Sequence, residues 1–270
     1  MAHLKRGDKA LVTGASSGIG AAYADALAAR GFNLVLVARR EDRLRDLATR
    51  LHKEFGVDGQ VLPADLADAT DLARVEDVLR AGGIDLLINN AGFGAYMPFV
   101  DLDADRAEKL LRVKVIAPTR LARAVLPSML QRGSGSVINV ASQLAFSGAL
   151  QMPQLPLRAT YAAANAYLVT FSELLNTEVG GRGVHIQVLC PGLVSTDFHR
   201  IQNRDISAAP NVMEAKNIVD ASLAAFELGE VICSPTVGDP SHVAAWESAG
   251  SKLFASNQGV VADRYRTNRA

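Results

Sequence analysis

The alternation of short apolar runs with longer amphipathic segments is the feature that most limits how this chain can fold. Most of the short runs are apolar almost throughout, as expected for strands of a parallel sheet that is covered on both faces. We predict strands at Lys9–Thr13, Asn33–Ala38, Gly59–Ala64, Ile84–Asn89, Ser136–Ala141, Val184–Cys190 and Glu230–Cys233. We predict helices at Gly18–Arg30, Glu41–Phe55, Asp68–Arg80, Asp103–Arg132, Ala159–Val179, Val212–Leu228 and Pro240–Ala255.

This order of elements is typical of stacked βαβ units. We therefore expect one doubly wound Rossmann domain over residues 1–270, with a central seven-stranded, mainly parallel sheet and helices on both faces. Its dinucleotide-binding half would span about residues 1–140 and its catalytic half about 136–270. Pro118 lies inside the longest predicted helix, where it must kink or interrupt the backbone hydrogen bonds.

Composition excludes several classes of function. The 28 basic and 28 acidic residues balance, so no net field favours nucleic acid or an anionic membrane. No run approaches the roughly 18 apolar residues of a membrane span, and the first residues lack the apolar stretch of a signal peptide. We expect a cytoplasmic protein in which Cys190 and Cys233 are reduced core thiols, with a disulfide as the alternative. The five histidines show no ligand spacing, so we expect no metal site.

A glycine-rich turn follows the first predicted strand directly. It reads Thr13-Gly14-Ala15-Ser16-Ser17-Gly18-Ile19-Gly20 and opens the first predicted helix. Glycines at such a turn let the backbone approach a pyrophosphate, and the helix N-terminus offers free N–H groups to it. The alternative is a Gly/Ser-rich turn without a ligand. Its place inside a complete βαβ unit favours a dinucleotide.

The end of the second predicted strand distinguishes between the two nicotinamide cofactors. An NAD site would place Asp or Glu there to bind the ribose 2′-hydroxyl, whereas this chain has Ala38, Arg39 and Arg40. A guanidinium suits a 2′-phosphate, so we predict NADP rather than NAD; the alternative is that both arginines are solvated charges. Asp65 and Leu66, after the third strand, fall where the adenine ring would lie.

These motifs together resemble the short-chain dehydrogenase/reductase family over essentially the whole chain. The glycine turn, Asn89-Asn90-Ala91-Gly92, Ser142, Tyr161 and Pro191-Gly192-Leu193-Val194-Ser195-Thr196 occur in the family's order. The resemblance implies hydride transfer between a nicotinamide and a carbonyl or alcohol. It also implies that Tyr161 exchanges a proton with the substrate oxygen while Ser142 holds that oxygen.

From the turn, the strand ends and the resemblance we expect a set of cofactor contacts. They are Gly14, Ser16, Ser17, Gly18, Ile19, Gly20, Arg39, Arg40, Asp65, Leu66, Asn90, Ala91, Gly92, Tyr161, Asn165, Pro191, Gly192, Val194 and Thr196.

The chain departs from the family pattern at two positions. The family has a lysine four residues after the tyrosine, which holds the ribose and lowers the tyrosine's pKa; here that residue is Asn165. The family has an asparagine in the fourth helix, where this chain has Lys114. A cation near a tyrosine lowers its pKa of about 10 by roughly 1–3 units, so its loss would reduce phenolate about tenfold to a thousandfold.

The two departures suggest an exchange, in which Lys114 supplies the cation and Asn165 the amide of one relay beside Tyr161. The alternatives are that Lys114 points elsewhere and catalysis is impaired, or that the site serves another task. If the exchange fails, Tyr161 stays protonated and reduction is favoured over oxidation. The catalytic candidates are thus Ser142, Tyr161, Lys114 and Asn165.

The leading hypothesis is an NADP-dependent oxidoreductase acting on a small or medium carbonyl or alcohol. The alternatives are a nucleotide-binding relative that has lost turnover, and a lyase or isomerase on the same scaffold. We expect the loops Gly94–Phe99, Gln143–Arg158 and Ser195–Ala209 to shape the pocket. The family's habit suggests a homodimer or homotetramer. Substrate identity, stereochemistry and the preferred direction do not follow from the sequence.

Overall fold

The structure is a computed structural model that describes residues 5–151, 155, 157–200, 205–206, 209–257 and 259–266. Its contacts divide the chain into two compact units, Met1–Pro235 and Thr236–Ala270. The smaller unit carries α9 (Ser241–Ala255) and the short turn η5 (Asp263–Tyr265). One domain over the whole chain stays a prediction.

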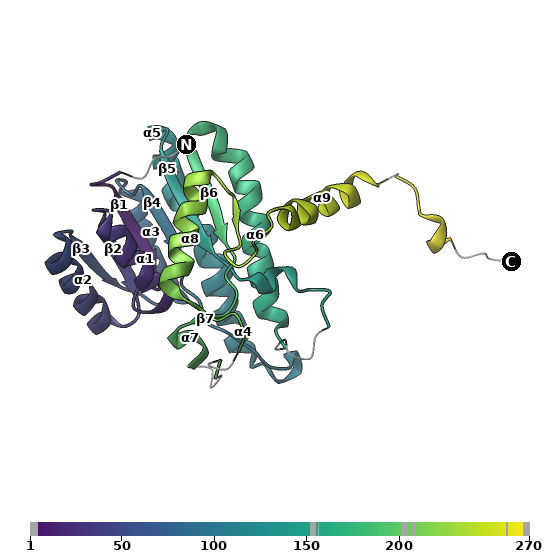
Figure 1. The fold of residues 1–270 in the computed structure, drawn as a ribbon, viewed down its shortest axis with the longest axis horizontal. Coiled ribbons are helices and arrows are strands. Elements are labelled where there is room, and N and C mark those ends of the chain that lie inside the picture. Colours follow the sequence, from purple (N-terminus) through teal and green to yellow (C-terminus); the bar gives the residue numbers. More distant parts are fainter. Residues whose placement is uncertain are drawn as a thin grey trace. The chain divides into compact units, whose positions relative to one another are not determined.

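The larger unit contains the doubly wound sheet that the sequence predicts (Figure 1). Seven parallel strands pair in the order β3-β2-β1-β4-β5-β6-β9. Their bounds are β1 (Lys9–Thr13), β2 (Asn33–Ala38), β3 (Gly59–Pro63), β4 (Leu86–Asn89), β5 (Gly135–Val140), β6 (Val184–Leu189) and β9 (Ile232–Cys233). Strand order reverses between β1 and β4, and ligands of such sheets bind at the carboxyl ends of strands beside that point.

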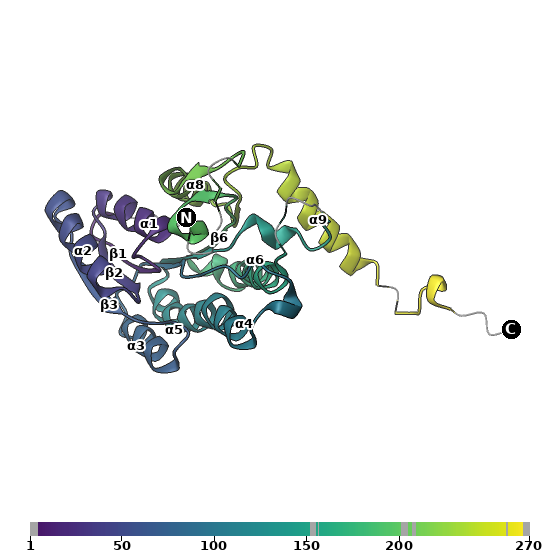
Figure 2. The ribbon, with the colours of Figure 1, turned by 90° about the horizontal axis from the view of Figure 1, so that it is seen from below.

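Helices cover both faces of this sheet (Figure 2). On one face, α1 (Gly18–Ala29), α2 (Glu41–Phe55) and α8 (Ala215–Leu228) bury one apolar cluster against the strands. On the other, α3 (Ala69–Arg80), α5 (Ala117–Arg132) and α6 (Ala159–Val179) bury a second. The strands are apolar on both faces because both are covered.

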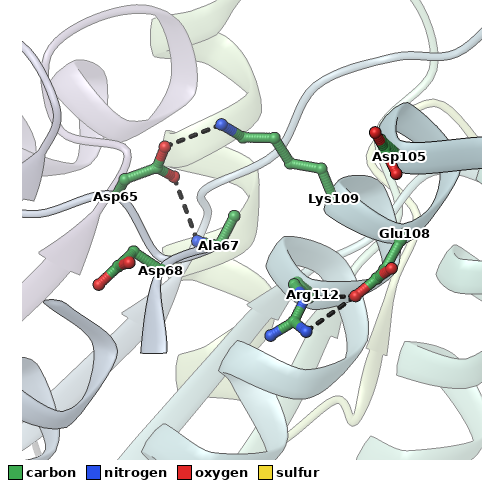
Figure 3. Close-up of a pocket in the computed structure, with 7 residues that line it drawn as sticks. All are labelled: Asp65, Ala67, Asp68, Asp105, Glu108, Lys109 and Arg112. Carbon is green, nitrogen blue, oxygen red and sulfur yellow. Dashed lines mark hydrogen bonds and ion pairs between the residues drawn. The ribbon is translucent and has the colours of Figure 1, made fainter. Parts of the chain in front are cut away.

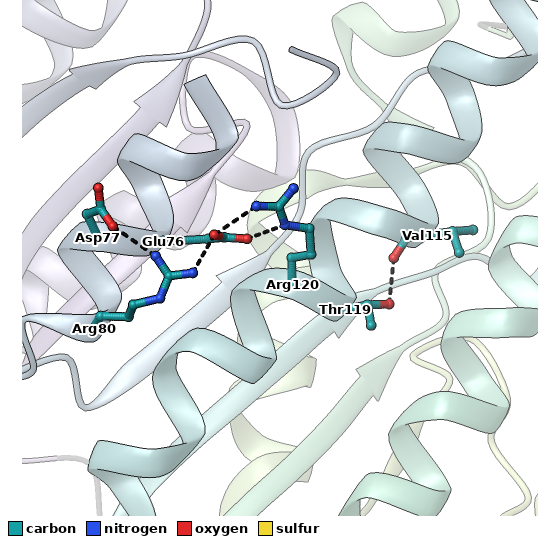
Figure 4. A network of polar contacts seen from close by, with 6 residues as sticks. All are labelled: Glu76, Asp77, Arg80, Val115, Thr119 and Arg120. Carbon is teal, nitrogen blue, oxygen red and sulfur yellow. Dashed lines mark hydrogen bonds and ion pairs between the residues drawn. The ribbon is translucent and has the colours of Figure 1, made fainter. Parts of the chain in front are cut away.

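The long helix predicted over Asp103–Arg132 is interrupted in the structure. It consists of α4 (Ala104–Leu111), a π-helical turn η2 (Arg112–Ile116) and α5. Pro118 has no N–H to donate to the carbonyl four residues earlier, so the regular ladder cannot continue through it. The Thr119 hydroxyl donates to the Val115 carbonyl at 2.7 Å (Figure 4). The interruption places Lys114 in the π-helical turn.

A second difference concerns the helix predicted to begin at Val212. In the structure, β8 (Met213–Glu214) pairs with β7 (Val194–Ser195), and α8 begins only at Ala215. The short helix α7 (Asp197–Arg200) follows β7. The two-stranded sheet ties the segment after β6 to the start of α8, so it positions residues that the sequence assigns to the cofactor.

A buried carboxylate joins α3 to α5. Glu76, only 2% exposed, accepts hydrogen bonds from Arg120 and, at 2.6 Å, from Arg80 (Figure 4). The hydrogen bond from Arg120 lowers the pKa of Glu76 below its usual value. Burial acts in the opposite direction and has a smaller effect.

Two further predictions concern the cysteines and the membrane. Cys190 and Cys233 are buried free thiols, as predicted. Among the residues described, every helix is too short or too polar to span a bilayer.

Candidate active site

The glycine turn after β1 is packed so closely that larger residues do not fit. Gly14 has φ +68°, and a Cβ there would lie 2.7 Å from Asn90 Nδ2. A Cβ on Gly20 would overlap the Gly14 carbonyl oxygen and lie 2.5 Å from the same amide nitrogen. The N-cap residue of α1, Ser17, makes no side-chain capping hydrogen bond. The turn therefore presents backbone N–H groups and the positive end of a helix dipole, which suits a phosphate.

Thr13 joins this turn to the end of β4. Its hydroxyl donates to the Ile88 carbonyl and accepts from the backbone N–H groups of Asn90 and Ala91 at 2.9 and 3.0 Å. Asn90 Nδ2 donates to the Thr13 carbonyl at 2.9 Å. No role for Thr13 was predicted from the sequence, although a hydroxyl at the end of an apolar strand was an available signal.

Of the two arginines after β2, Arg40 faces the glycine turn. It donates at 2.9 Å to the hydroxyls of both Ser16 and Ser17, whereas Arg39 is exposed. Burial, together with the like charges of Arg43 and Arg39, lowers the pKa of Arg40. Clustered guanidinium groups beside two hydroxyls form a set of donors with geometry suited to a phosphate monoester.

Asp65 lines a hollow of about 430 Å³ at the end of β3 (Figure 3). The residues around it are Asp65, Ala67, Asp68, Asp105, Glu108, Lys109 and Arg112. Asp65 accepts hydrogen bonds from Lys109 Nζ at 2.9 Å and from the Ala67 N–H. Although burial raises the pKa of Asp65, these donors bring it below its usual value. Leu66 packs into the core instead of lining the hollow.

Ser142 and Tyr161 come together at the carboxyl end of β5. Ser142 caps the short helix η3 (Gln143–Phe146), and its hydroxyl accepts from the Leu144 N–H at 3.2 Å. Tyr161 lies in the first turn of α6 and is 6% exposed. Burial raises the pKa of Tyr161, while the side chains of Tyr96, Asn165 and Ser142 act in the opposite direction. The side chains that lower it are neutral.

Lys114 and Asn165 are both buried close to this pair. Lys114 Nζ donates to the Val140 carbonyl at 2.8 Å, two residues before Ser142. Burial lowers the pKa of Lys114 to about 8. Asn165 Nδ2 donates to the Tyr161 carbonyl at 2.8 Å, and Asn165 Oδ1 is buried without a hydrogen-bond partner. The Lys114 ammonium is thus bound to β5, and the buried Asn165 Oδ1 can accept a hydrogen bond from a further donor.

The segment after β6 approaches the glycine turn from the other side. A Cβ on Gly18 would lie 3.1 Å from Thr196 Cγ2, and the Gln143 N–H donates to the Pro191 carbonyl at 3.0 Å. Val194 is buried in β7, and Ile19 packs against the same core. The predicted cofactor residues of this segment therefore lie between the glycine turn and the loop that follows Ser142.

Two aromatic residues, Tyr96 and Phe198, contact the ring of Tyr161. From the sequence we predicted only that they lie in loops that shape the pocket. Tyr96 and Phe198 have ring centroids 5.1 and 6.0 Å from that of Tyr161. Of the loop Gln143–Arg158, residues 152–154 and 156 lie outside the described residues, as do 201–204 and 207–208 of Ser195–Ala209.

Comparison with known proteins gives concordant matches. A model of the short chain dehydrogenase family matches residues 8–207. The mouse very-long-chain 3-oxoacyl-CoA reductase is 32% identical over 200 residues, which are 73% of this chain and 62% of that protein. The chain thus spans about three fifths of that relative's length.

Two solved structures match nearly all of the chain. A short-chain dehydrogenase from Sphingobium yanoikuyae in complex with NADPH is 38% identical, with a TM-score of 0.90 over 96% of this chain and 100% of that one. A bulky-bulky ketone specific alcohol dehydrogenase from Comamonas testosteroni is 37% identical, with a TM-score of 0.86 over 96% of this chain and 98% of that one.

Proposed function

Because the chain belongs to the short-chain dehydrogenase/reductase family, we propose that it is an NADP(H)-dependent oxidoreductase that transfers a hydride between the nicotinamide and a carbonyl or alcohol. One observation carries the proposal: a continuous path of contacts runs from the glycine turn to Tyr161. Asn90 packs on Gly14, and Gly92 lies against Lys114. Lys114 donates to Val140, the last residue of β5, and Ser142, two residues later, contacts Tyr161.

The residues present fit a dinucleotide. The glycine turn packs too closely against Asn90 and its own backbone for Cβ atoms at Gly14 and Gly20. The N-terminus of α1 lacks a side-chain cap, so its backbone N–H groups are available to a pyrophosphate. Asn165 Oδ1, buried and unpartnered, is an acceptor for a ribose hydroxyl. Arg40 with Ser16 and Ser17 would hold the 2′-phosphate, which supports NADP over NAD.

When bound, NADPH would supply the hydride to the carbonyl carbon. Tyr161 would donate its phenolic proton to the carbonyl oxygen, and the Ser142 hydroxyl would hold that oxygen. Because burial raises the pKa of Tyr161, the phenol keeps its proton at neutral pH. A protonated phenol favours reduction, and comparable rates in both directions at neutral pH would contradict this assignment.

We propose that Lys114 and Asn165 together replace the family's lysine, which supplies a positive charge and binds the ribose. Lys114 would place a positive charge beside β5 and Ser142, and Asn165 would bind the ribose. The test is NADPH turnover by the wild type, Lys114→Met and Asn165→Lys. The exchange predicts at least about a tenfold loss of kcat in Lys114→Met, because the proton relay beside Ser142 would lose its positive charge. Full activity in Lys114→Met would exclude it.

The substrate that suits this site is a carbonyl with apolar substituents. Phe93, Tyr96, Leu144 and Phe198 pack against the buried cluster that contains Tyr161. The Comamonas testosteroni relative is described as specific for bulky-bulky ketones, which makes such ketones a suitable first panel. A homodimer or homotetramer in the cytoplasm belongs to the proposal as well.

Two measurements distinguish this function from the alternatives. NADPH fluorescence reports binding, and loss of the reduced-nicotinamide absorbance with a ketone reports hydride transfer. Binding without transfer across the panel would favour a binding protein. A changed substrate with an unchanged nicotinamide would favour a lyase or isomerase.

A further inference from the structure

The loop between β4 and η1 (Phe99–Asp101) carries a second phenol to Tyr161. The ring of Tyr96 meets that of Tyr161 edge to face, at 71° and with centroids 5.1 Å apart. Phe198, from α7, completes the group at 6.3 Å from Tyr96 and 6.0 Å from Tyr161. Three segments distant in sequence thus place three rings in mutual contact.

This loop is anchored on α4. Arg106 donates to the Gly94 carbonyl at 3.2 Å, and its guanidinium lies 5.9 Å from the centroid of the Phe93 ring. Ala95, 3% exposed, packs in the same cluster as Tyr161 and Leu110 of α4. Contacts at the three residues before Tyr96 therefore anchor the loop where it reaches Tyr161.

The groups that face Tyr161 come from each neighbouring element. Ser142 comes from the end of β5, Asn165 from the next turn of α6, and Tyr96 from the anchored loop. Lys114, on the π-helical turn, is bound to the Val140 carbonyl. After burial, which raises the pKa of Tyr161, the hydrogen bond from Tyr96 has the largest effect and lowers it.

We propose that Tyr96 is a positioning residue for proton transfer, whose hydroxyl holds the Tyr161 oxygen and whose ring, with Phe198, walls the space for an apolar substituent of the carbonyl. The inference rests on the proposed function, because Tyr161 must be the proton donor. As the proton passes from Tyr161 to the substrate oxygen, a phenolate forms, and the Tyr96 O–H stabilises it as a neutral donor. The chain thereby supports a phenolate next to an asparagine where the family has a lysine.

The test titrates Tyr161 without any cofactor. The chain has five tyrosines, so uniform incorporation of ring-fluorinated tyrosine gives a small set of fluorine NMR signals. Ring fluorine makes the phenol more acidic and brings its titration to lower pH. The Tyr161 signal is identified by its absence in Tyr161→Phe. In Tyr96→Phe, which keeps the ring and removes the hydroxyl, we expect the Tyr161 pKa to rise by about one unit.

The matched control is Phe198→Leu, which removes a ring contact and no hydroxyl. It should not raise the Tyr161 pKa, because it can only reduce the burial of Tyr161, and it should raise KM for ketones with aromatic substituents. An unchanged Tyr161 pKa in Tyr96→Phe, or an equal rise in both variants, would overturn the proposal. If the pKa rises only in Tyr96→Phe but the wild type reduces no ketone, the proposed function fails while the hydrogen bond stands.

Discussion

Lys114 is a buried cation that donates a hydrogen bond to the Val140 carbonyl, and its burial predicts an unusual pH dependence of stability. Its side chain is 4% exposed, and burial lowers its pKa from 10.5 to about 8. Between these two values the unfolded chain holds a proton on this lysine that the folded chain has released. Stability therefore rises with pH in this window, and the benefit is lost as the pH falls through about 8.

The size of the effect follows from the two pKa values. The difference between 10.5 and about 8 is roughly 2.5 pH units, at about 1.4 kcal/mol each, or about 3.5 kcal/mol in total. At pH 10.5 the unfolded lysine is still half protonated, so about 3 kcal/mol of this is present. In Lys114→Met this contribution is absent. The free energy of unfolding of the wild type minus that of Lys114→Met should therefore increase by about 3 kcal/mol between neutral pH and pH 10.5.

Urea unfolding of both proteins across this range measures the difference directly. Groups that titrate in both proteins cancel, and replacing the exposed Lys53 by methionine provides the matched control for loss of a surface lysine. A flat difference for Lys114→Met would show that the lysine is solvated in the folded chain. The assignment of Lys114 as a buried cation beside β5 would then be wrong.

Three more substitutions probe the cofactor turn and the scaffold. Arg40→Ala should weaken NADPH binding about tenfold to a hundredfold in fluorescence titrations, because charge-assisted hydrogen bonds to the 2′-phosphate are lost, and should leave NADH binding nearly unchanged. Arg45→Ala, at an exposed position, is the control. Equal losses of affinity for both cofactors would contradict the assignment of Arg40. Gly20→Ala should reduce NADPH binding at least tenfold because its Cβ overlaps the Gly14 carbonyl, while Gly148→Ala, where a Cβ meets open space, should bind normally. Glu76→Gln should lower the free energy of unfolding by about 2 kcal/mol at neutral pH, and Asp77→Asn, on the same helix but exposed, should have little effect in the same urea titration. Because the pKa of Glu76 is lowered in the folded chain, its carboxylate stabilises the fold above the ordinary carboxyl pKa of 4.5. This stabilisation is lost as the pH falls through the folded pKa. A destabilisation by Glu76→Gln that persisted in acid would contradict this role of the carboxylate.

The sheet and the glycine turn were predictable because their signals are local. Continuous apolar runs indicated the strands, and glycines between a strand and a helix indicated the turn at Gly14–Gly20. The break near Pro118 was also predicted, since a missing N–H is a property of that residue alone. Its form, a π-helical turn that carries Lys114, was not.

The features that sequence reasoning missed depend on contacts between distant residues. The β7–β8 pair forms because Val194 meets Met213 in space, so the strand signal of each segment alone was too short. Arg40 faces Ser16 whereas Arg39 is exposed, and adjacent identical residues give no cue for this choice. Tyr96 reaches Tyr161 through a loop whose course is set by Arg106. Long-range packing decided each of these.

The most direct measurement follows deuterium from NADPH that is dideuterated at the nicotinamide C4 into the product of an apolar ketone. We expect the wild type to form alcohol with deuterium at the former carbonyl carbon. We expect Tyr161→Phe to bind NADPH with similar affinity but to form at least about a hundredfold less product, because general acid catalysis is lost. Unlabelled product, or equal turnover in Tyr161→Phe, would contradict the proposed function.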